Sequence, residues 1–510
     1  MSEVSTAIRF ILNDEEITLS DVRPDTTLLD WLRLDRRLRG SKEGCAEGDC
    51  GACTVLVGRL LDGEIIYDSV TACIRFVGSL HGTHVVTIEH LRGVEGHLHP
   101  VQQAMVDHHG SQCGFCTPGF VMSLYGLWMR DPQPSRSTIE KALQGNLCRC
   151  TGYAPIIRAA EAMSGYGQPQ GDPLWAERIA LKEKITAIND GRRVEIGEGA
   201  EQIIIPANLD DFATLYERFP QATIVNGSTD VGLWVTKFMR PIGPVIFINH
   251  LQELKRIAEN DSEVRFYAGV SYSQALPVIT ANFPHMGELW SRIAGEQIRN
   301  MGTIGGNIAN GSPIGDTPPP FIVLGAKLTL RRGAHRREIK LEDYFLAYGK
   351  QDRAPGEFVE SVTLPLLPAG EKFAVYKISK RREEDISTLC GAFRVFVNDQ
   401  GLVGMARIAF GGMAATPKRA KTVEAALIGK PWTMATVEAA LPAFASDYQP
   451  ITDMRASAEY RLLAAQNLLK RFLRVMPDPV LTLKLYRLFM TANGTYVNGQ
   501  RPNATNRNRY

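Results

Sequence analysis

The sequence has no long hydrophobic run and almost no excess of charge of either sign. No stretch of about 18 apolar residues occurs, so we expect no membrane-spanning helix. The opening residues, MSEVSTAIRF, lack a basic region followed by an apolar core, which predicts no secretory signal and a cytoplasmic protein. A net charge of +2 argues against a nucleic-acid or membrane-binding surface. The 510 residues, 44% apolar and 22% charged, suit a globular protein of several domains.

Cysteine is nearly absent from the last two thirds of the chain. Cys390 is the single cysteine there, in an apolar run that predicts a packed core residue. The other eight lie before residue 151, and Cys148 and Cys150 are separated by one residue, a spacing that strains a disulfide. Because a reducing compartment also disfavours disulfides, metal ligation is the leading interpretation of these thiols.

The first four cysteines follow the spacing C-x4-C-x2-C, with the fourth twenty positions further on. This is the spacing of plant-type [2Fe–2S] ferredoxins. Glycines among them let a short loop wrap a small cluster and expose N–H groups to its sulfurs. Alternating strand patterns flank the loop and break at Asn13-Asp14 and Asp62-Gly63, where we expect hairpin turns. The set comprises Cys45, Cys50, Cys53 and Cys73, with Gly44, Gly48 and Gly51 among them.

The second set stands at the beginnings of predicted helices. Residues 101–162 have apolar side chains three and four apart, as in GFVMSLYGLWM, which predicts a helical domain. Each cysteine pair precedes such a run, and Pro118 and Pro155 lie near the helix starts. Helix N-termini favour negative charge, which a cluster with four thiolates carries. Two facing helix starts could thus hold a second [2Fe–2S] centre on Cys113, Cys116, Cys148 and Cys150.

A structural zinc site is the alternative on spacing alone, because C-x2-C is a common zinc half-site. The C-x-C pair and the C-x4-C-x2-C loop are less usual for zinc, so the two-iron interpretation leads. Haem attachment is excluded, since C-x-x-C-H does not occur. Each set already has four thiols, so we expect the histidines between them to be surface residues of a polar connector: His97, His99, His108 and His109.

Two glycine-rich turns stand out in the second part of the chain. After a polar segment, interpreted as a linker with one short helix, the pattern is strand, helix, strand and the turn IVNGSTDVG. The second turn lies in MGTIGGNIANGSPIGD, where Gly305 and Gly306 have no packing use in a helix or strand. Turns of small residues present N–H groups to phosphates, so two of them suit a dinucleotide. The G-x-G-x-x-G fingerprint is missing from both, which predicts a flavin fold of another kind.

Beyond residue 377 the pattern changes to strands, such as TLCGAFRVFV, followed by amphipathic helices, such as ASAEYRLLAAQNLLKRFLRVM. The charged stretch 377–385, taken on its own residues, is typical of a solvated loop. The last residues are polar and without periodicity, so we predict a mobile tail.

The cysteine loops resemble those of the xanthine dehydrogenase family of molybdenum hydroxylases. They are GCAEGDCGAC, QCGFCTPG and GNLCRCTGYAPI, with Asp49 where animal members carry glycine. The resemblance runs in order over about residues 5–485 and implies an α+β multidomain fold. The implied parts are a β-grasp plant-type ferredoxin domain (1–90), a four-helix [2Fe–2S] domain (91–165), a linker (166–198), a two-part α/β FAD-binding domain (199–375), a C-terminal α+β flavin subdomain (376–490) and the tail (491–510).

The same resemblance assigns residues to the flavin. Ile293 falls where animal members have an aromatic residue beside the flavin, and Asn310 replaces a threonine. Lys377 matches a lysine at the flavin edge, and Val359 matches an aliphatic contact. The implied FAD-binding set is Ile224, Val225, Asn226, Gly227, Ser228, Thr229, Asp230, Val231, Ile293, Thr303, Gly305, Gly306, Asn307, Asn310, Asp316, Val359 and Lys377.

In this family two one-electron clusters and a flavin carry electrons away from a molybdenum–pterin centre. The resemblance implies that Cys148 and Cys150 share one centre with Cys113 and Cys116. We see no molybdenum-binding segment, so we expect the iron–sulfur/FAD small subunit of a bacterial-type xanthine dehydrogenase. It would dock on a large molybdopterin-binding chain, in a dimer of heterodimers. Electrons from the oxidation of hypoxanthine or xanthine to urate would pass through both clusters to FAD and on to NAD⁺, while hydroxylation itself would occur on the partner.

Several alternatives stay open. A related hydroxylase acting on aldehydes, nicotinate or another N-heterocycle would use the same cofactors, because the other chain sets substrate choice. O₂ could replace NAD⁺ as acceptor, since no NAD fingerprint is legible. Carbon-monoxide dehydrogenases usually keep cluster and flavin parts on separate chains, and their fusion here argues against that activity. A zinc-stabilised interaction module and a stand-alone NADH-linked electron carrier are the alternatives from other classes.

Overall fold

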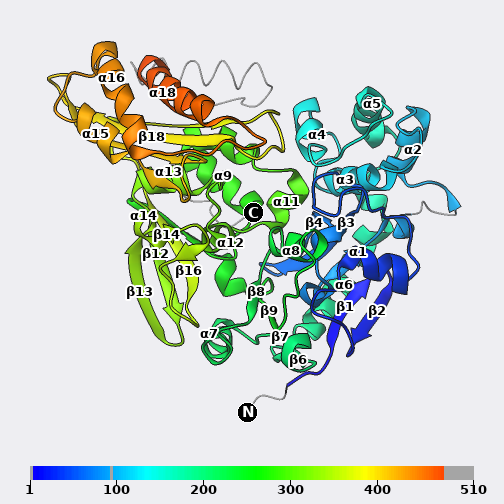
Figure 1. Ribbon diagram of the computed structural model, residues 1–510. Helices are drawn as coiled ribbons and strands as arrows, with labels where there is room; N and C mark the ends of the chain where they lie inside the picture. The colour runs from blue at the N-terminus through cyan, green and yellow to red at the C-terminus, as the bar shows by residue number, and fades with distance from the viewer. Residues whose placement is uncertain (1–3, 92–95, 476–510) are drawn as a thin grey trace.

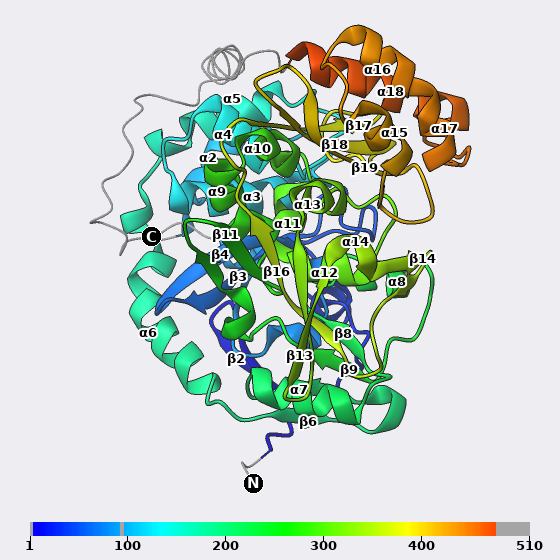
Figure 2. The same cartoon turned by 90° about the vertical axis from the view of Figure 1, so that its left-hand side faces the viewer.

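The computed structural model describes residues 4–91 and 96–475, which form four connected parts (Figure 1). A β-rich part in dark blue lies beside a lobe of helices in cyan. A larger part, green to yellow, packs against both, and an orange part covers its far end (Figures 1 and 2). Within the described residues, no helix has the length and apolar character needed to cross a membrane. The predicted mobile tail, 491–510, lies outside them.

The first part is a mixed five-stranded sheet with the order β2-β1-β5-β3-β4. Both predicted hairpins are confirmed, and Asp62 and Gly63 have the positive φ angles of a tight two-residue turn. β5 runs parallel to β1 and antiparallel to β3. Both faces of the sheet are buried, with Phe10 and Val55 in one apolar cluster and Ile11 and Leu56 in another. The elements are β1 (Ile8–Leu12), β2 (Glu15–Leu19), α1 (Leu28–Asp30), β3 (Thr54–Leu61), β4 (Glu64–Thr71) and β5 (His84–Val86).

The second part contains four helices, as predicted. On α3, every residue from Gly119 to Trp128 is buried, because the helix lies between the other helices and the first sheet. Pro118 and Pro155 occupy the first turns of α3 and α5, where a missing N–H costs nothing. The helices are α2 (Pro100–Asp107), α3 (Thr117–Arg130), α4 (Arg136–Ala142) and α5 (Ala154–Ala162).

His99 is not the surface residue that the polar connector suggested. It is buried, its Nδ1 accepts a hydrogen bond from the Val101 N–H at the start of α2, and its Nε2 lies 2.9 Å from Asp172 Oδ2. Tyr125 donates to the other oxygen of Asp172 at 3.0 Å. His99 is buried because of a tertiary contact. Asp172 caps the helix that begins at Pro173, and His99 is a polar partner of its buried carboxylate. His97 and His109 are exposed, as expected.

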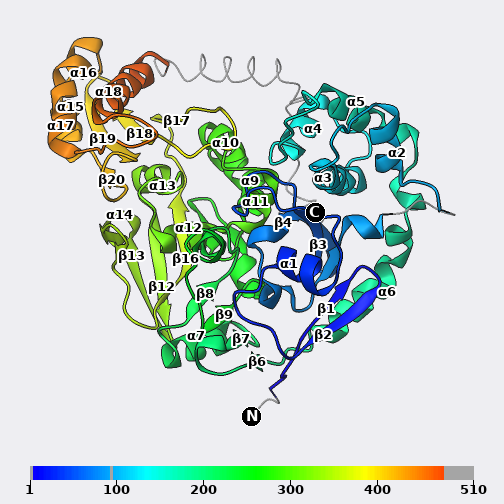
Figure 3. The ribbon, with the colours of Figure 1, turned by 45° about the vertical axis from the view of Figure 1, so that its right-hand side comes forward.

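The segment 166–198 is more structured than a linker with one short helix. It forms α6 (Pro173–Ile188), sixteen residues long, which packs along the first sheet and the helical lobe (Figure 3). Leu181, Ile185 and Ile188 are buried in the same apolar cluster as Trp128. Charged residues on the other faces hide this stripe in the sequence, so only the neighbouring sheet shows which side is buried.

The third part has two main sheets, in agreement with a two-part α/β domain, and a two-stranded sheet, β14-β15. The smaller sheet, ordered β6-β7-β9-β8, is parallel across β7, β9 and β8, and the larger one, β10-β11-β16-β12-β13, is antiparallel. The elements are β6 (Val194–Ile196), β7 (Ile203–Ile205), α7 (Leu209–Arg218), β8 (Thr223–Val225), α8 (Val231–Thr236), β9 (Val245–Phe247), β10 (Ile257–Glu259), β11 (Glu263–Tyr267), α9 (Tyr272–Asn282), α10 (Pro284–Ser291), α11 (Glu296–Met301), α12 (Ile304–Asn310), α13 (Pro318–Leu324), β12 (Lys327–Arg332), β13 (His335–Lys340), α14 (Leu341–Tyr344), β14 (Phe345–Ala347), β15 (Lys350–Gln351) and β16 (Phe358–Pro365).

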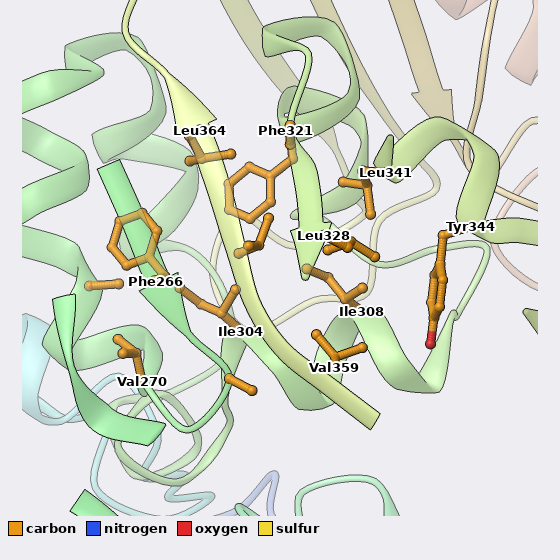
Figure 4. Packing of buried hydrophobic residues seen from close by; sticks show 14 of the residues in the cluster. Phe266, Val270, Ile304, Ile308, Phe321, Leu328, Leu341, Tyr344, Val359 and Leu364 are labelled. Atoms are coloured by element: carbon orange, nitrogen blue, oxygen red, sulfur yellow. The ribbon is translucent and has the colours of Figure 1, made fainter. Parts of the chain in front are cut away.

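The core of this part fills the space between its helices and the antiparallel sheet (Figure 4). Figure 4 shows Phe266, Ile304 and Phe321 pointing into one apolar layer, with Ile308 and Val359 beside them. All five are at most 5% exposed. α12 contributes Ile304 and Ile308 to this layer. The core therefore fixes the position of the glycine-rich segment that includes α12.

The fourth part is a four-stranded sheet, β17-β18-β19-β20, covered by helices. Phe393 and Phe472 stack with their ring centroids 5.3 Å apart and attach the last helix to β18. This confirms the predicted change from strands to amphipathic helices. The elements are β17 (Glu371–Ile378), β18 (Leu389–Val397), β19 (Val403–Gly411), β20 (Lys418–Arg419), α15 (Lys421–Leu427), α16 (Met434–Ala440), α17 (Phe444–Asp447) and α18 (Ala458–Val475).

The packing of α6 can be tested with a matched pair of substitutions. Ile185→Ala removes a fully buried side chain, so we expect the free energy of unfolding to fall by about 2–5 kcal/mol. Ile179→Ala on the same helix removes a side chain that is 75% exposed, and we expect a change within about 0.5 kcal/mol. Urea unfolding followed by circular dichroism measures both. Equal effects of the two substitutions would show that α6 does not pack as described.

Candidate cofactor sites

The first cysteine set is gathered by the loop that leads into β3. Cys53 and Cys73 are buried at the edge of the sheet, whereas Cys45 and Cys50 lie in the loop and are half-buried. The Cys50 N–H points at Cys45 Sγ, 3.4 Å away. Gly48 and Gly51 have φ angles of 81° and 66°. These left-handed angles, which glycine adopts freely, let the loop turn back on itself.

The four thiols of this first set contact one another. Hydrogen bonds from Cys50 and Cys73 hold the pKa of the Cys45 thiol well below its ordinary value. The same contact with Cys45 raises the pKa of Cys50, and contacts with Cys45 and Cys53 raise that of Cys73. All four cysteines are free thiols. The structure therefore joins Cys50, Cys45, Cys73 and Cys53 in one continuous group, as the sequence predicted.

The second set is formed by two segments that face each other. Cys116 precedes α3, and Cys148 and Cys150 lie in the turn before α5. Burial and a hydrogen bond with Cys148 raise the pKa of Cys116 to about 12, and a hydrogen bond with Cys113 raises the pKa of Cys150. Each contact therefore pairs one thiol from each segment. Cys113 and Cys150 are exposed, so this group lies at the surface of the protein.

These pairs suit two-iron centres. A [2Fe–2S] cluster with four cysteines places two thiolates on each iron. The Thr151 N–H and Oγ1 also point at Cys148 Sγ, at 3.4 and 3.1 Å. Although burial acts to raise it, these hydrogen bonds hold the pKa of Cys148 below its ordinary value, which favours the thiolate that iron binds.

The two cysteine loops touch directly. The Leu147 N–H, next to Cys148, donates to the carbonyl of Cys50 at 3.0 Å. The Asn146 side chain donates to the carbonyl of Gly51 at 3.2 Å. A Cβ on Gly51 would lie 2.1 Å from the Gly145 carbonyl, and one on Gly119 would lie 2.1 Å from the Gly51 carbonyl. No side chain fits at these positions, so the glycines permit the close approach.

Gln297, on α11 of the flavin part, extends this junction to a third part of the chain. Its Nε2 lies 3.2 Å from Thr54 Oγ1, 3.2 Å from Ser123 Oγ and 3.0 Å from Asn146 Oδ1. The side chain is fully buried. Sequence reasoning missed Gln297, because a single glutamine in a short helix carries no motif and its partners are far away in the sequence.

The first predicted FAD turn follows β8. Ser228 has a φ of 56°, and its buried hydroxyl has no hydrogen-bond partner within the described chain. A Cβ on Gly227 would lie 1.9 Å from the Met301 carbonyl and 3.1 Å from Gly302 Cα. The turn is therefore pressed against the second predicted FAD segment. An unpaired buried hydroxyl beside a bare backbone turn suits a phosphate oxygen, so these residues fit the pyrophosphate of FAD.

The second predicted segment begins with Thr303, whose Oγ1 accepts the Gly306 N–H at 3.1 Å at the start of α12. A Cβ on Gly305 would lie 2.3 Å from the Cβ of Ala268, so this glycine has a packing role after all. Asn307 Oδ1 accepts a hydrogen bond from Thr317. Gly306 and Asn310 are exposed.

Three further predicted residues meet at one place. Lys377 Nζ lies 2.7 Å from Asp316 Oδ2, and both side chains are at most 10% exposed. Ser387 donates to the other oxygen of Asp316. Lys377 also lies 3.5 Å from the carbonyl of Arg292, next to Ile293. Lys377 is therefore not part of a solvated loop, whereas Arg381 and Arg382 further along the stretch are exposed.

Val359 and Cys390 lie in the packed interior. Val359 pairs with Leu330 in the larger sheet and contributes to the layer in Figure 4. Cys390 is 1% exposed, which agrees with its predicted core role. A contact of Val359 with FAD stays a prediction, as does each residue of the FAD set.

A cavity of about 570 Å³ separates the ferredoxin-like sheet from the flavin part. Asn226, Gly227 and Thr303 line one end of it, so the cavity reaches both predicted FAD turns. The other predicted FAD residues do not line it. Residues of β3, β4 and the segment after β9 form part of its wall.

Four family models match successive regions of the chain. They are described as a 2Fe-2S iron-sulfur cluster binding domain (residues 10–77), a [2Fe-2S] binding domain (87–161), an FAD binding domain in molybdopterin dehydrogenase (198–367) and a CO dehydrogenase flavoprotein C-terminal domain (374–476).

Curated relatives align over most of the chain. A xanthine dehydrogenase of Emericella nidulans is 31% identical over 502 residues, which cover 88% of this chain and 37% of that protein. A xanthine dehydrogenase/oxidase of Gallus gallus is 30% identical, with 84% and 37% covered. The chain thus spans little more than a third of the length of these relatives.

Two solved structures share part of the fold. A Cu,Mo-CO dehydrogenase chain is 26% identical, with a TM-score of 0.50, and covers 53% of this chain and 94% of its own length. A carbon monoxide dehydrogenase chain from Hydrogenophaga pseudoflava is 29% identical, with the same TM-score and coverage.

The fold and these matches define an oxidoreductase with two [2Fe–2S]-binding domains and an FAD-binding domain, of the molybdenum hydroxylase class. Within that class, the chain belongs to the xanthine dehydrogenase family.

The contact between the two cysteine loops can be tested on α3. Gly119→Ala would push a methyl group into the Gly51 carbonyl, so we expect the free energy of unfolding to fall by about 1–3 kcal/mol and the two loops to separate. Gly126→Ala on the same helix meets only the end of the Leu56 side chain, which can move, so we expect a smaller change. Thermal unfolding and hydrogen exchange of the Leu147 amide measure both effects. An unchanged Leu147 exchange rate in Gly119→Ala would contradict the described contact.

Proposed function

We propose that this chain carries electrons from a molybdenum centre outside it to FAD and then to NAD⁺, through two [2Fe–2S] clusters. The clusters would be held by Cys113, Cys116, Cys148 and Cys150 in the helical part, and by Cys45, Cys50, Cys53 and Cys73 in the ferredoxin-like part. When bound, they supply one-electron steps and the flavin supplies two-electron transfer. The residues of the chain would hold these groups close together.

The observation that carries the proposal is the central position of the loop around Cys45 and Cys50. On one side, the Cys50 carbonyl accepts the Leu147 N–H of the helical part. On the other side, the Ala46 carbonyl accepts a hydrogen bond from Thr236 Oγ1 at 2.6 Å, at the end of α8. The first predicted FAD turn leads directly into α8. One loop therefore contacts both the second cysteine group and the helix that follows the flavin turn.

The exposure of the thiols supports a direction for the electrons. Cys113 and Cys150 lie at the surface, where an electron donor on another protein domain can approach them. Cys53 and Cys73 are buried, in one apolar cluster with Val225 and Met301 of the flavin part. We therefore infer the order of helical-part cluster, ferredoxin-like cluster and flavin.

The finer assignments follow from the family. We propose that the substrate is hypoxanthine or xanthine, oxidised to urate at a molybdopterin centre of a large partner subunit, in a dimer of heterodimers within the cytoplasm. The names of the relatives with 30–31% identity favour this substrate. The carbon monoxide dehydrogenase structures keep other substrates open, so a hydroxylase of aldehydes or other N-heterocycles is the second candidate.

Metal content tests the cluster assignment. The purified chain should contain about four irons and no zinc, because each [2Fe–2S] centre holds two irons. Cys148→Ser should lower the iron content to about two, because it removes a ligand of one centre only. Cys390→Ser, which changes a buried thiol away from both groups, should leave four. Zinc in place of iron would instead support an interaction module.

Electron transfer is tested on the full chain without the proposed partner. It should absorb as an iron–sulfur flavoprotein and oxidise NADH with an artificial acceptor, yet fail to oxidise xanthine. Adding the large molybdopterin subunit should then allow xanthine to reduce the clusters, as seen by electron spin resonance. Turnover of xanthine by the chain alone would refute the assignment of the molybdenum centre to a partner.

A further inference from the structure

The cavity between the ferredoxin-like sheet and the flavin part is lined by an unusual group of charges. Arg59 on β3, Asp68 on β4 and Arg75 just after β4 face it from the sheet. Lys255 faces it from the segment between β9 and β10. These four residues, the cationic group below, come from other elements than the FAD turns that also line the cavity.

The cationic group has more positive than negative charge. Arg59 Nε lies 2.9 Å from Asp68 Oδ2, and this is the only ion pair within the group. Arg75 makes one long hydrogen bond, 3.4 Å, to the Ser79 carbonyl. The side chain of Lys255 has no hydrogen bond or ion pair within the described residues. When Lys255 is protonated, the three cations and one carboxylate of the group leave a net charge of +2.

Polar atoms of the group are also left unpaired. Arg75 is 9% exposed, and its Nε is buried without a hydrogen-bond partner within the described chain. Nη1 of Arg59 is buried and unpaired in the same way. Buried cations are normally paired, because removing a charge from water is costly, so each unpaired atom needs an explanation.

None of the other charged groups that line the cavity forms an ion pair with Arg75 or Lys255 within the described residues. Glu253 accepts the Leu209 N–H at 3.3 Å, Asp62 lies in the exposed hairpin turn, and Arg192 pairs with Asp190 at 2.7 Å. Burial lowers the pKa of His81 and of His250 to about 4, so both are neutral near pH 7. Burial, together with the charges of Arg59 and Arg75, lowers the pKa of Lys255 to about 7, against a smaller opposing effect of Asp68.

We propose that this cavity binds a phosphate-bearing anion, inorganic phosphate or a phosphomonoester, through Arg59, Arg75 and Lys255. A doubly charged phosphate would balance the net charge of +2. Guanidinium groups offer paired N–H donors that match phosphate oxygens, and an ammonium adds a further charge. A volume of about 570 Å³ also leaves room for an organic group on the phosphate. The inference does not depend on the proposed electron transfer.

A phosphate of FAD itself is the other possible source of this chemistry, since one end of the cavity reaches Asn226, Gly227 and Thr303. We commit to a free phosphate compound, because the cationic group comes from β3, β4 and the segment after β9, whereas these three residues belong to the turns after β8 and before α12. The two sources predict different results with the FAD-loaded protein. If the site takes a free phosphate compound, that compound binds in the presence of FAD. If a phosphate of FAD occupies the site, FAD prevents the binding of added phosphate.

Isothermal titration of the full chain, loaded with FAD and iron, with inorganic phosphate tests the site. Ionic strength is kept constant with sodium chloride. We expect saturable binding accompanied by proton uptake at pH 8, because a bound anion restores the charge of Lys255. Below about pH 6 Lys255 is already protonated, so the uptake should disappear. Phosphate is then largely the monoanion, so binding of the dianion should release a proton instead. Buffers of different ionisation enthalpy measure the protons.

Substitutions connect the binding to the cationic group. Lys255→Met should abolish proton uptake and weaken phosphate binding roughly tenfold or more, and Arg75→Gln should weaken binding to a similar degree. Lys255→Arg should restore affinity without proton uptake. Lys182→Met, on the exposed face of α6, is the matched control and should behave as the unchanged protein. Iron content and circular dichroism show that each variant is folded.

Three results would overturn the proposal. They are a lack of saturable binding, binding that Lys255→Met and Arg75→Gln leave unchanged, and binding to the FAD-free chain that FAD abolishes. If Lys255→Met does not fold, Lys255→Gln and Arg75→Gln decide the same question. None of these variants alters the proposed cluster or flavin residues, so a failure here leaves the proposed function untouched.

Discussion

The hydrogen bond from the Leu147 N–H to the Cys50 carbonyl is the contact on which the rest of the structure depends. It joins a residue beside Cys148 in one part of the chain to a predicted iron ligand in another. Gly51 and Gly119 make the contact possible, because a side chain at either would strike a backbone carbonyl. The close approach of the two thiol groups is thus a consequence of backbone packing, and the side chains around it secure it.

The flavin part stabilises that contact from a third direction. Gln297 hydrogen-bonds to Thr54, Ser123 and Asn146, so one buried side chain holds both cysteine loops. Thr236, at the end of α8, donates a hydrogen bond to the carbonyl of Ala46, in the loop that carries Cys45 and Cys50. These contacts tie the position of the flavin turn to that of the thiol groups. Buried hydrogen bonds of this kind lose their partners if any part moves, which favours a single fixed arrangement.

Local signals made much of the fold predictable. The hairpin turns at Asn13 and Asp62, the helix starts at Pro118 and Pro155, and the two thiol groups all follow from short stretches with a known conformational cause. The length and burial of α6 did not, because its apolar residues are scattered among charges. His99 was mistaken for a surface residue for a similar reason: its partner, Asp172, is 73 positions away.

The amino-acid sequence by itself determined the elements, the cysteine spacings and the glycine turns, because each depends on the preferences of neighbouring residues. Only the tertiary structure decided which distant groups meet. It brought Lys377 to Asp316, Gln297 to Asn146, and Lys255 to Arg59 and Arg75. Such pairings depend on how sheets and helices pack, so no local pattern of residues encodes them.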